Sequence, residues 1–270
     1  MKRNLKRALG VVALMLDLLN GCVIDVVNLD DDWEHSGNAE ASAAFSRTLA
    51  LGEQTVIRVV GANGSVKIWG VPGAQGVVVD AVRRVRSDSR QDAEAHLASL
   101  QVSAQAWSHE FEVKTVQPRD SYGRNFIVDY EITVPAHLVT KVANGNGSIR
   151  IEDIDADVEV VNGNGEVTLA DVTGSSRVSV GNGTVSAGTH LPPTGQVVYA
   201  VGNGAIFLSV QTQASAQFSA KVGNGTIHVT GLDLQNVVSS PRQLQGVLGS
   251  GIGLIDLSTG NGEIRVQGGE

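Results

Sequence analysis

The residues with the clearest potential for chemistry are carboxylates and arginines in the middle of the chain. They are Asp153, Asp155, Asp157 and Asp171, with Arg150 and Arg177 nearby. Paired carboxylates can act as general acid and base on a glycan, and some β-helical proteins cleave acidic polysaccharides in this way. The alternative is a solvated acidic rim beside glycine-rich loops. We favour the rim, because no comparable set recurs at residues 202–210 or 223–230, and we predict no enzyme activity.

Patterns for metals, cofactors and phosphates are weaker still. The acidic triplet Asp30-Asp31-Asp32 has few rigid neighbours that could help to hold a cation, and the six histidines lack the close pairs of a zinc site. The glycine-rich segments GANGSVK and ANGNGSI lack both the Lys-Ser/Thr ending and the following helix of a phosphate-binding loop. The sequence therefore predicts no metal site and no cofactor.

One basic cluster and a few aromatic residues remain. The cluster is Arg83, Arg84, Arg86 and Arg90. It could contact lipopolysaccharide, teichoic acid or a phospholipid surface. We favour a structural interpretation, in which these charges form the solvated face of a strand and protect its edge from sheet-to-sheet association. The aromatic residues Trp69, Trp107 and Tyr130 are too scattered for a sugar-binding platform, and we expect them to pack in the core.

The N-terminus predicts export and a lipid anchor. Four cationic residues precede the apolar run VVALMLDLLNGC, which is too short to span a bilayer but suits a secretory signal. The run ends at Cys22, the only cysteine in the chain, at the place where a bacterial lipobox carries the lipidated residue. A plain secretory signal with a chance cysteine is the alternative. We predict a signal peptide over 1–21 and a membrane-anchored lipoprotein that faces the periplasm or the cell exterior.

Composition narrows the class of protein. The net charge of −8 argues against a nucleic-acid partner, because such binding draws on clustered Lys and Arg. A single cysteine excludes an intramolecular disulfide. The 32 glycines, 6 prolines and many valines suit short β-strands joined by glycine turns rather than collagen or disorder.

After the predicted signal peptide, the chain divides into three further parts. Residues 22–44 are polar and acidic and predict a flexible tether, with strands beginning near Phe45. Residues 45–140 show the alternation of half-buried strands, interrupted at 88–100 by helical spacing of apolar residues after a candidate N-cap, Ser89. Residues 141–270 carry repeats, and 45–270 is predicted to be one continuous domain.

The repeats share an Asn/Gly-Gly-Asn-Gly turn followed by alternating apolar residues. An early copy contains Asn63 and Gly64, and the later turns contain the pairs Asn146 and Gly147, Asn164 and Gly165, Asn182 and Gly183, Asn203 and Gly204, Asn224 and Gly225, and Asn261 and Gly262. The later asparagines are about 20 residues apart, apart from one wide gap, for which we expect a degenerate copy at 237–249. The apolar pairs that follow, such as Ile149 and Ile151 or Ile227 and Val229, should point inward.

Two architectures suit this pattern. Asn-Gly is a strong hairpin signal, which would give an antiparallel meander. A parallel β-solenoid, or β-helix-like fold, explains better why the turn is constant, because stacked corners place equal asparagines one strand spacing apart, where their amides can form a ladder. Glycines would supply the positive φ angles of each corner. We predict the solenoid, with the terminal copy at Asn261 less important than interior copies.

In these motifs the chain resembles the bacterial putative-adhesin β-strand-repeat family, which includes the head domains of putative autotransporter adhesins. The likeness covers about residues 45–270 and rests on GANGSVKIWG at 61–70, ITVP at 132–135 and the recurring Gly-Asn-Gly turns. The resemblance implies a secreted or surface-anchored β-solenoid-like domain without catalytic residues.

The expected function is therefore that of a non-catalytic, lipid-anchored surface scaffold or binding module. Its partners would be the membrane, through the anchor, and envelope glycans or another surface protein. A glycan-binding or glycan-degrading β-helix is the alternative. Small and polar outer faces, as in SVQTQASAQFSAKV at 209–222, favour the first function.

Overall fold

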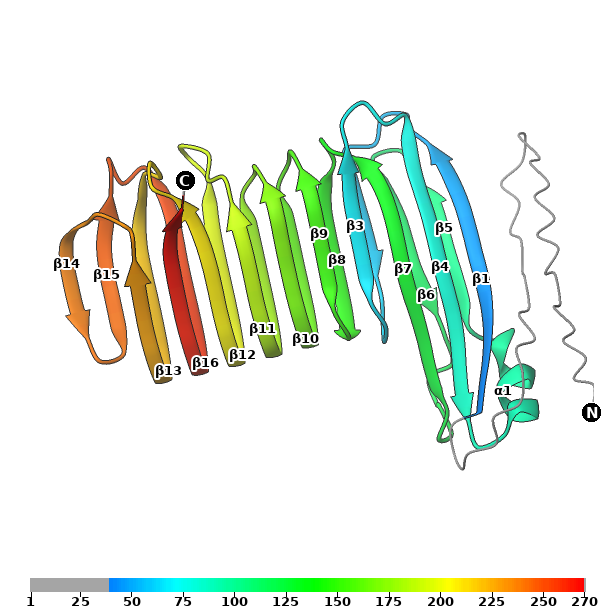
Figure 1. Ribbon diagram of the computed structural model, residues 1–270. Helices are drawn as coiled ribbons and strands as arrows, with labels where there is room; N and C mark the ends of the chain where they lie inside the picture. The colour runs from blue at the N-terminus through cyan, green and yellow to red at the C-terminus, as the bar shows by residue number, and fades with distance from the viewer. Residues whose placement is uncertain (1–38, 270) are drawn as a thin grey trace, which may run out of the picture.

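The computed structural model describes residues 39–269, which form 16 strands and one helix, α1 (Arg90–Leu97). All the strands belong to one continuous sheet of mixed parallel and antiparallel pairs. The sheet folds over on itself, so that two rows of strands face each other across one apolar core (Figure 1). The predicted all-β class with a short helix is confirmed.

The first part of the chain supplies one end of both rows. The first row begins with β1 (Ala39–Ala50), β4 (Gly76–Ser87), β7 (Asn125–Pro135), β3 (Val66–Val71) and β9 (Ile149–Ile154). The second row begins with β5 (Gln101–Ala106), β6 (Glu110–Val116), β2 (Val56–Val60) and β8 (Val139–Asn146). The sequence predicts a flexible tether that continues to residue 44, but β1 already begins at Ala39. Ala41, Ala43 and Phe45 alternate as buried positions of this strand.

The repeats form long strands that belong to both rows. These strands are β10 (Val158–Val172), β11 (Ser176–Thr189), β12 (Gln196–Gln211), β16 (Gly253–Gly269) and β13 (Ala216–Thr230). In β10, residues 158–164 pair in parallel with β8, whereas residues 167–172 pair in parallel with β9. The Gly-Asn-Gly segment lies at the change from the second row to the first. Each repeat thus contributes one rung to each row.

The core lies between the rows and follows the alternation that the sequence predicts. In β10, Val158 and Val160 are buried from the second row, and Val167 and Leu169 are buried from the first. Strands β11, β12 and β16 are aligned with β10 in register and have apolar residues at the same positions, except for the buried Ser176 of β11, which is aligned with Val158. Burial of these side chains drives the two rows together.

The spatial order of the repeats differs from their order in the chain. Strand β16, the last in the sequence, pairs with β12 on one side and with β13 on the other. The terminal copy at Asn261 is therefore an interior rung, so the expectation that it lies at an end of the stack is wrong. The end rung is Asn224. The turns have nearly the same sequence, so local chemistry does not distinguish which copy lies beside which.

The wide gap between the last two turns does not contain a degenerate copy. Residues 237–249 contribute instead to an antiparallel hairpin of β14 (Leu234–Ser240) and β15 (Gln243–Leu248), and β15 pairs with the first half of β13. The segment lacks a Gly-Asn-Gly turn and reverses direction at Pro241-Arg242. The hairpin extends the second row only.

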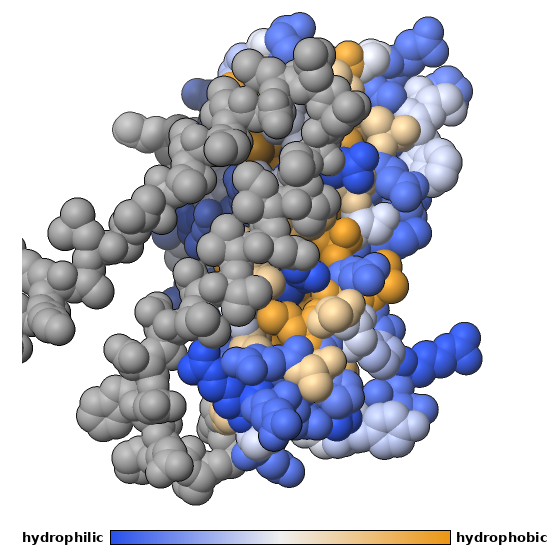
Figure 2. Space-filling view, turned by 90° about the vertical axis from the view of Figure 1, so that its right-hand side faces the viewer, coloured by the Kyte–Doolittle hydropathy of each residue, from blue (hydrophilic) through white to orange (hydrophobic). Residues whose placement is uncertain are grey.

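Helix α1 packs against β1 and β4 at the opposite end of the molecule. Ser89 is its N-cap and accepts a hydrogen bond from the Asp92 backbone N–H, which confirms the predicted cap. Ala93, Leu97 and Leu100 are buried beneath it. Figure 2 looks onto this end and shows apolar residues bordered by hydrophilic ones.

The predicted edge role of the basic cluster is wrong, because β4 lies between β1 and β7 and is not an edge strand. Its arginines form ion pairs and hydrogen bonds inside the first part of the chain. Arg83 is buried and donates to the Leu100 carbonyl oxygen at 3.0 Å, Arg84 pairs with Asp129, Arg86 pairs with Glu40, and Arg90 of α1 pairs with Glu94.

Candidate functional site

A hydrogen-bonded ladder of asparagine side chains runs along the stacked turns. Each amide donates to the next side-chain oxygen at 2.7 or 2.8 Å. In spatial order the ladder contains Asn63, Asn146, Asn164, Asn182, Asn203, Asn261 and Asn224. At one end, Asn63 donates to the Phe126 carbonyl oxygen at 3.2 Å. The structure thus brings together all the turn residues that the sequence singled out.

The glycine after each ladder asparagine has a φ angle between +120° and +150°. Gly165 shows why this position excludes a side chain: besides its φ of +128°, an added Cβ would overlap the Gly147 carbonyl oxygen of the neighbouring rung. The ladder side chains themselves are solvent-exposed or nearly so. This stack is a structural site, because its polar groups are satisfied by one another rather than directed toward a ligand.

A second, inner set of polar residues was missed in the sequence. Asn162 is buried two residues before a ladder asparagine, and its amide donates to the Gly147 carbonyl oxygen at 3.0 Å. Asn144 and Thr259 occupy equivalent positions and also donate to turn carbonyls. Later copies have valine there, as at Val180 and Val201. The signal was the extra asparagine in VANGNG and VVNGNG.

The structure does not assemble the aspartates and arginines of the middle segment into one site. Arg150 lies on β9 in the first row and pairs with Glu152, whereas Arg177 lies on the second-row half of β11. Asp157 accepts a hydrogen bond from the Ser175 backbone N–H at 2.8 Å. Asp153 and Asp171 have φ angles of +59° and +53° at equivalent positions of successive coils. Asp153 and Asp171 thus lie near the ends of β9 and β10, and Asp155 and Asp157 lie in the short connection between these strands.

The three aromatic residues have different positions. Tyr130 is fully buried and its hydroxyl group hydrogen-bonds to Thr115 at 2.8 Å, as expected for the core. Trp69 is only half-buried, on the outer side of β3, and donates to Glu152 at 2.9 Å. Trp107 is 53% exposed. The prediction of core packing is therefore wrong for both tryptophans, because each occupies an outward position of its strand or lies beyond the strand's end.

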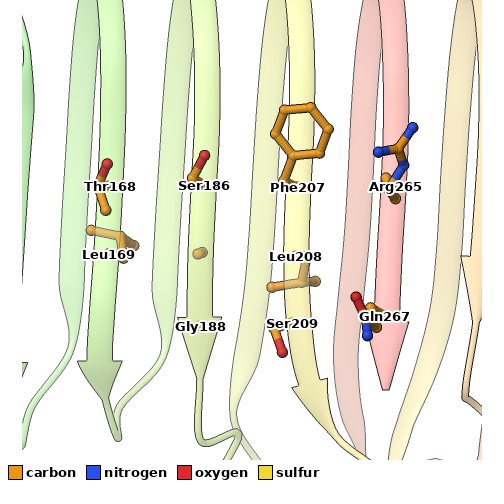
Figure 3. Close-up of a pocket in the computed structure, with 10 residues that line it drawn as sticks. Thr168, Leu169, Ser186, Gly188, Phe207, Leu208, Ser209, Arg265 and Gln267 are labelled. Carbon is orange, nitrogen blue, oxygen red and sulfur yellow. The ribbon is translucent and has the colours of Figure 1, made fainter. Parts of the chain in front are cut away.

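A shallow hollow on the outer face of the first row is the best candidate for a binding site. Its volume is about 360 Å³, and it crosses β10, β11, β12 and β16. Figure 3 shows Thr168, Ser186, Phe207 and Arg265 side by side at one level of these strands, with Gly188, Ser209 and Gln267 at the next. Gly188 widens the hollow, because nothing lies within 4 Å of the place of a Cβ.

The hollow offers an aromatic ring beside hydrogen-bonding groups. The Arg265 guanidinium lies 5.7 Å from the centre of the Phe207 ring and also pairs with Glu263 at 2.7 Å. Hydroxyl groups of Thr168, Ser186 and Ser209 and the Gln267 amide complete the lining. The Phe207 ring can stack against a flat apolar face of a ligand, and the polar side chains can form hydrogen bonds to polar groups at the edge of that face. The hollow holds no pair of carboxylates for acid–base chemistry.

A second hollow, of about 430 Å³, lies on the outer face of the second row. Charged side chains dominate it: Lys141 pairs with Glu159 at 3.2 Å, and Arg177 lies next to Glu159 in register. With Asp157, which also lines the hollow, two positive and two negative charges face one another. This hollow therefore has less to offer an uncharged ligand than the first.

The displaced pKa values in 39–269 mostly have structural causes away from the hollows. Hydrogen bonds from Arg124 and Ser87 hold the pKa of Asp92 well below its usual range. Burial raises the pKa of Tyr130 to about 12. Burial also raises the pKa of Tyr199, whose hydroxyl group pairs with that of Ser176 at 2.7 Å. Each group stabilises packing rather than a reactive centre.

Two predicted features concern the membrane and metals. Cys22 lies outside the described residues, so its lipidation stays a prediction. Within 39–269, no helix has both the length and the apolar character needed to cross a bilayer. In the same range, no group of three or more His, Cys, Asp or Glu side chains is arranged to hold a metal ion.

No protein-family model and no curated protein matches this chain. A solved structure of a putative cell adhesion protein from Clostridium sporogenes is similar at a TM-score of 0.44 and 12% identity, over 84% of this chain and 100% of that one. A putative adhesin from Bacteroides fragilis has a TM-score of 0.25 and 10% identity, over 83% and 96%. A putative lipid binding protein from Parabacteroides distasonis has a TM-score of 0.30 and 11% identity, over 83% and 96%. Likeness at this level does not tell what the present chain binds.

Proposed function

We propose that the protein is an exported, non-catalytic envelope protein of adhesin type, anchored in a membrane through a lipid on Cys22. It serves as a scaffold or binding module at the periplasmic or outer surface. The cationic N-terminus, the short apolar run and the lone cysteine support export and anchoring. The observation that carries the binding role is the hollow around Phe207 on the outer face of the first row.

The repeats act as a β-solenoid in this proposal. Parallel, in-register pairing of β10, β11, β12, β16 and β13 supports it, as does the asparagine ladder at the common corner. A scaffold of this kind is rigid, because every interior rung is fixed by backbone hydrogen bonds to both neighbours. It presents side chains of separate repeats at regular spacing on its outer faces.

The absence of catalysis is part of the proposal. It is supported by the engagement of Asp157 with the Ser175 backbone N–H and by the separation of Arg150 and Arg177 on different rows. Incubation of the protein with acidic polysaccharides should release no products. Turnover that disappears in Asp153→Ala or Asp155→Ala would contradict the proposal.

Glycan binding without cleavage is the second candidate, and the hollow favours it. A sugar ring has an apolar face that can lie against Phe207 and hydroxyl groups that can bond to Ser186, Gln267 or Arg265. An array of envelope glycans, probed with the exported protein, tests this. Phe207→Ala should lose the binding, whereas Tyr122→Ala, at a residue 81% exposed and outside the hollow, should retain it. Equal binding by both variants would exclude the hollow as the site.

The anchor is tested separately, by metabolic labelling of cells with a palmitate analogue. The chain should take up the label and fractionate with membranes, because the lipid would be attached to Cys22. Cys22→Ser should abolish both properties. Label that persists in Cys22→Ser would contradict the anchor and leave the glycan test unaffected.

A further inference from the structure

The two rows of strands end at different places at the end of the molecule farthest from α1. In the first row the last strand is the second half of β13, residues 226–230, which pairs only with β16. The second row continues past β13 by two strands, β15 and then β14 (Figure 1). The molecule therefore ends in a step, which is formed by residues 226–230 of β13 in the first row and by the projecting hairpin β14–β15 in the second row.

The step leaves apolar side chains incompletely covered. Ile227 and Val229 are only half-buried, although their counterparts in the two neighbouring rungs, Ile264 and Val266 or Ile206 and Leu208, are all buried. Leu234 and Leu244 of the hairpin are also half-buried, and Val237 is 50% exposed. The sequence pattern that predicts inward positions for Ile227 and Val229 is intact, so what is missing is a strand on the far side of β13.

The step also leaves backbone groups without a strand partner. In residues 226–230, one edge of the strand has no neighbour among the described residues, and the same holds for the outer edge of β14. Unpaired edges of this kind accept further strands unless charges, proline or bulges prevent it. A bulge at Asn236 protects the upper part of β14, but residues 238–240 are regular.

Charge does not oppose association here. The segments TIHVT at 226–230 and LQNVVSS at 234–240 contain no Asp, Glu, Lys or Arg, in a chain whose net charge is −8. The connection between the two segments carries a single charged residue, the exposed Asp233. Two copies approaching through a strongly acidic surface would therefore repel each other more than two copies approaching through the step. The step is thus the part of the repeat end best suited to contact an identical acidic chain.

We propose that two copies of this chain interlock at their steps. A two-fold axis parallel to the strands places the second row of one copy in line with the first row of the other. The β14–β15 hairpin of each copy then fills the empty place beyond β13 in the first row of the other copy. The edge of β13 then pairs with the edge of β14 from the second copy, twice. Each hairpin covers the apolar side of the other, and the overhang of two strands on one row is complementary to itself.

The other end of the molecule does not offer the same fit. There, β1 and β5 end the two rows together and are in contact, and α1 packs against β1 and β4. Charged residues, Glu40 and Arg47, also lie on β1. The proposed contact is therefore confined to the end that carries β14, and it gives a closed dimer rather than a filament.

Thiol cross-linking in cells that express the full chain tests this arrangement. Thr226 follows the Gly225 turn directly, and Ser240 is aligned through Gln243 with Lys221, close to the same turn. Rotation about an axis parallel to the strands does not shift a residue along the strand direction. Thr226 of one copy should therefore lie near Ser240 of the second copy. Chains carrying Thr226→Cys and Ser240→Cys, with different epitope tags, are co-expressed and treated with a bismaleimide. The chain without the two added cysteines is the control, which measures any cross-linking through Cys22.

The expected product is a dimer that contains both tags, since β13 lies beside β14 and not beside another β13. Adding Val238→Lys to the Ser240→Cys chain should lower the yield of mixed dimer at least about tenfold, because a lysine would lie on the paired edge. Val161→Lys, at a 51% exposed position of β10 far from the step, is the matched control and should leave the yield unchanged. Val238 is 66% exposed, so its replacement should not disturb the monomer.

Three results would overturn the proposal. They are the absence of any cross-linked dimer, a yield of same-tag dimers equal to that of mixed ones, and linkage of the step to a different polypeptide. The last result would mean that the step accepts a strand from another protein.

Discussion

The first part of the chain, residues 39–138, and the repeats that follow are stabilised in different ways. In the first part, particular side chains join elements far apart in sequence: Arg124 donates to both carboxylate oxygens of Asp92 at 2.6 and 2.7 Å, and Arg84 pairs with Asp129. In the repeats, the recurring contacts are backbone pairs and one amide ladder. Stability is concentrated in a few contacts in the first part and spread over equal neighbours in the second.

The two parts should therefore lose stability through different kinds of substitution. In a stack of equal rungs, the damage from a substitution depends on whether the rung has a neighbour on both sides. In the first part, it depends on whether a polar group loses its single partner.

The largest effect should come from side chains at the turn glycines. Gly165→Val should lower the free energy of unfolding by roughly 3 kcal/mol or more, because valine resists a positive φ and its Cβ would overlap the Gly147 carbonyl oxygen. Gly262→Val should cost about as much, since β16 is an interior strand. Gly225→Val should cost less in the monomer, because the first-row half of β13, which begins after this turn, has no strand on its far side and can shift outward. Chemical denaturation of the three variants measures this, and equal losses in all three would contradict the stacking argument.

The buried tyrosine hydroxyls should come next. Tyr199→Phe leaves the Ser176 hydroxyl group without its partner at a site that is 1% exposed, which should cost roughly 1–2 kcal/mol. Tyr130→Phe should cost less, because Thr115 is only half-buried and can bond to water. Thermal melts of both variants test the order of the two losses.

The same tyrosines predict how the protein behaves in alkali. Burial raises the pKa of Tyr130 to about 12 and raises that of Tyr199 as well, so both hydroxyl groups stay protonated in the fold after they would ionise in the unfolded chain. Their contribution is complete below pH about 10 and is lost as the pH rises further. Tyr199→Phe should therefore lose less stability than the wild-type protein between neutral and strongly alkaline pH.

A smaller, pH-dependent effect is expected at Asp92. Arg124 and Ser87 lower its pKa in the folded state, so its charge contributes stability above the ordinary carboxyl pKa of about 4. This contribution is lost as the pH falls below that value. Asp92→Asn should therefore melt below the wild-type protein at neutral pH and approach it in acid. Asp120→Asn, on an exposed loop, is the control and should show no such convergence.

The smallest effect is expected at the inner asparagine of the repeats. Asn162→Val should change the free energy of unfolding by less than about 1 kcal/mol, in either direction. The substitution removes one hydrogen bond to Gly147, but it also removes a buried side-chain oxygen that has no hydrogen-bond partner within the protein. Val180 already occupies the equivalent place in the next rung. A loss above about 2 kcal/mol would show that the inner amide is essential to the stack.

The sequence by itself determined the local features of this protein. Alternation predicted the buried positions of β10, the positive φ of Gly165 followed from the turn, and Ser89 was recognised as a helix cap. Each of these depends on residues a few places apart, where the geometry of the backbone leaves little choice.

The tertiary structure alone decided which elements became neighbours. Nothing in the turn sequences distinguishes Asn261 from Asn224 as the end rung, because equal turns stack equally well in either order. The step at β13 and the pairing of Arg84 with Asp129 likewise depend on where distant segments meet. Local chemistry specifies what a rung is. The choice of its partner is a property of the whole chain, set by which connections can be closed while the apolar faces of both rows are buried.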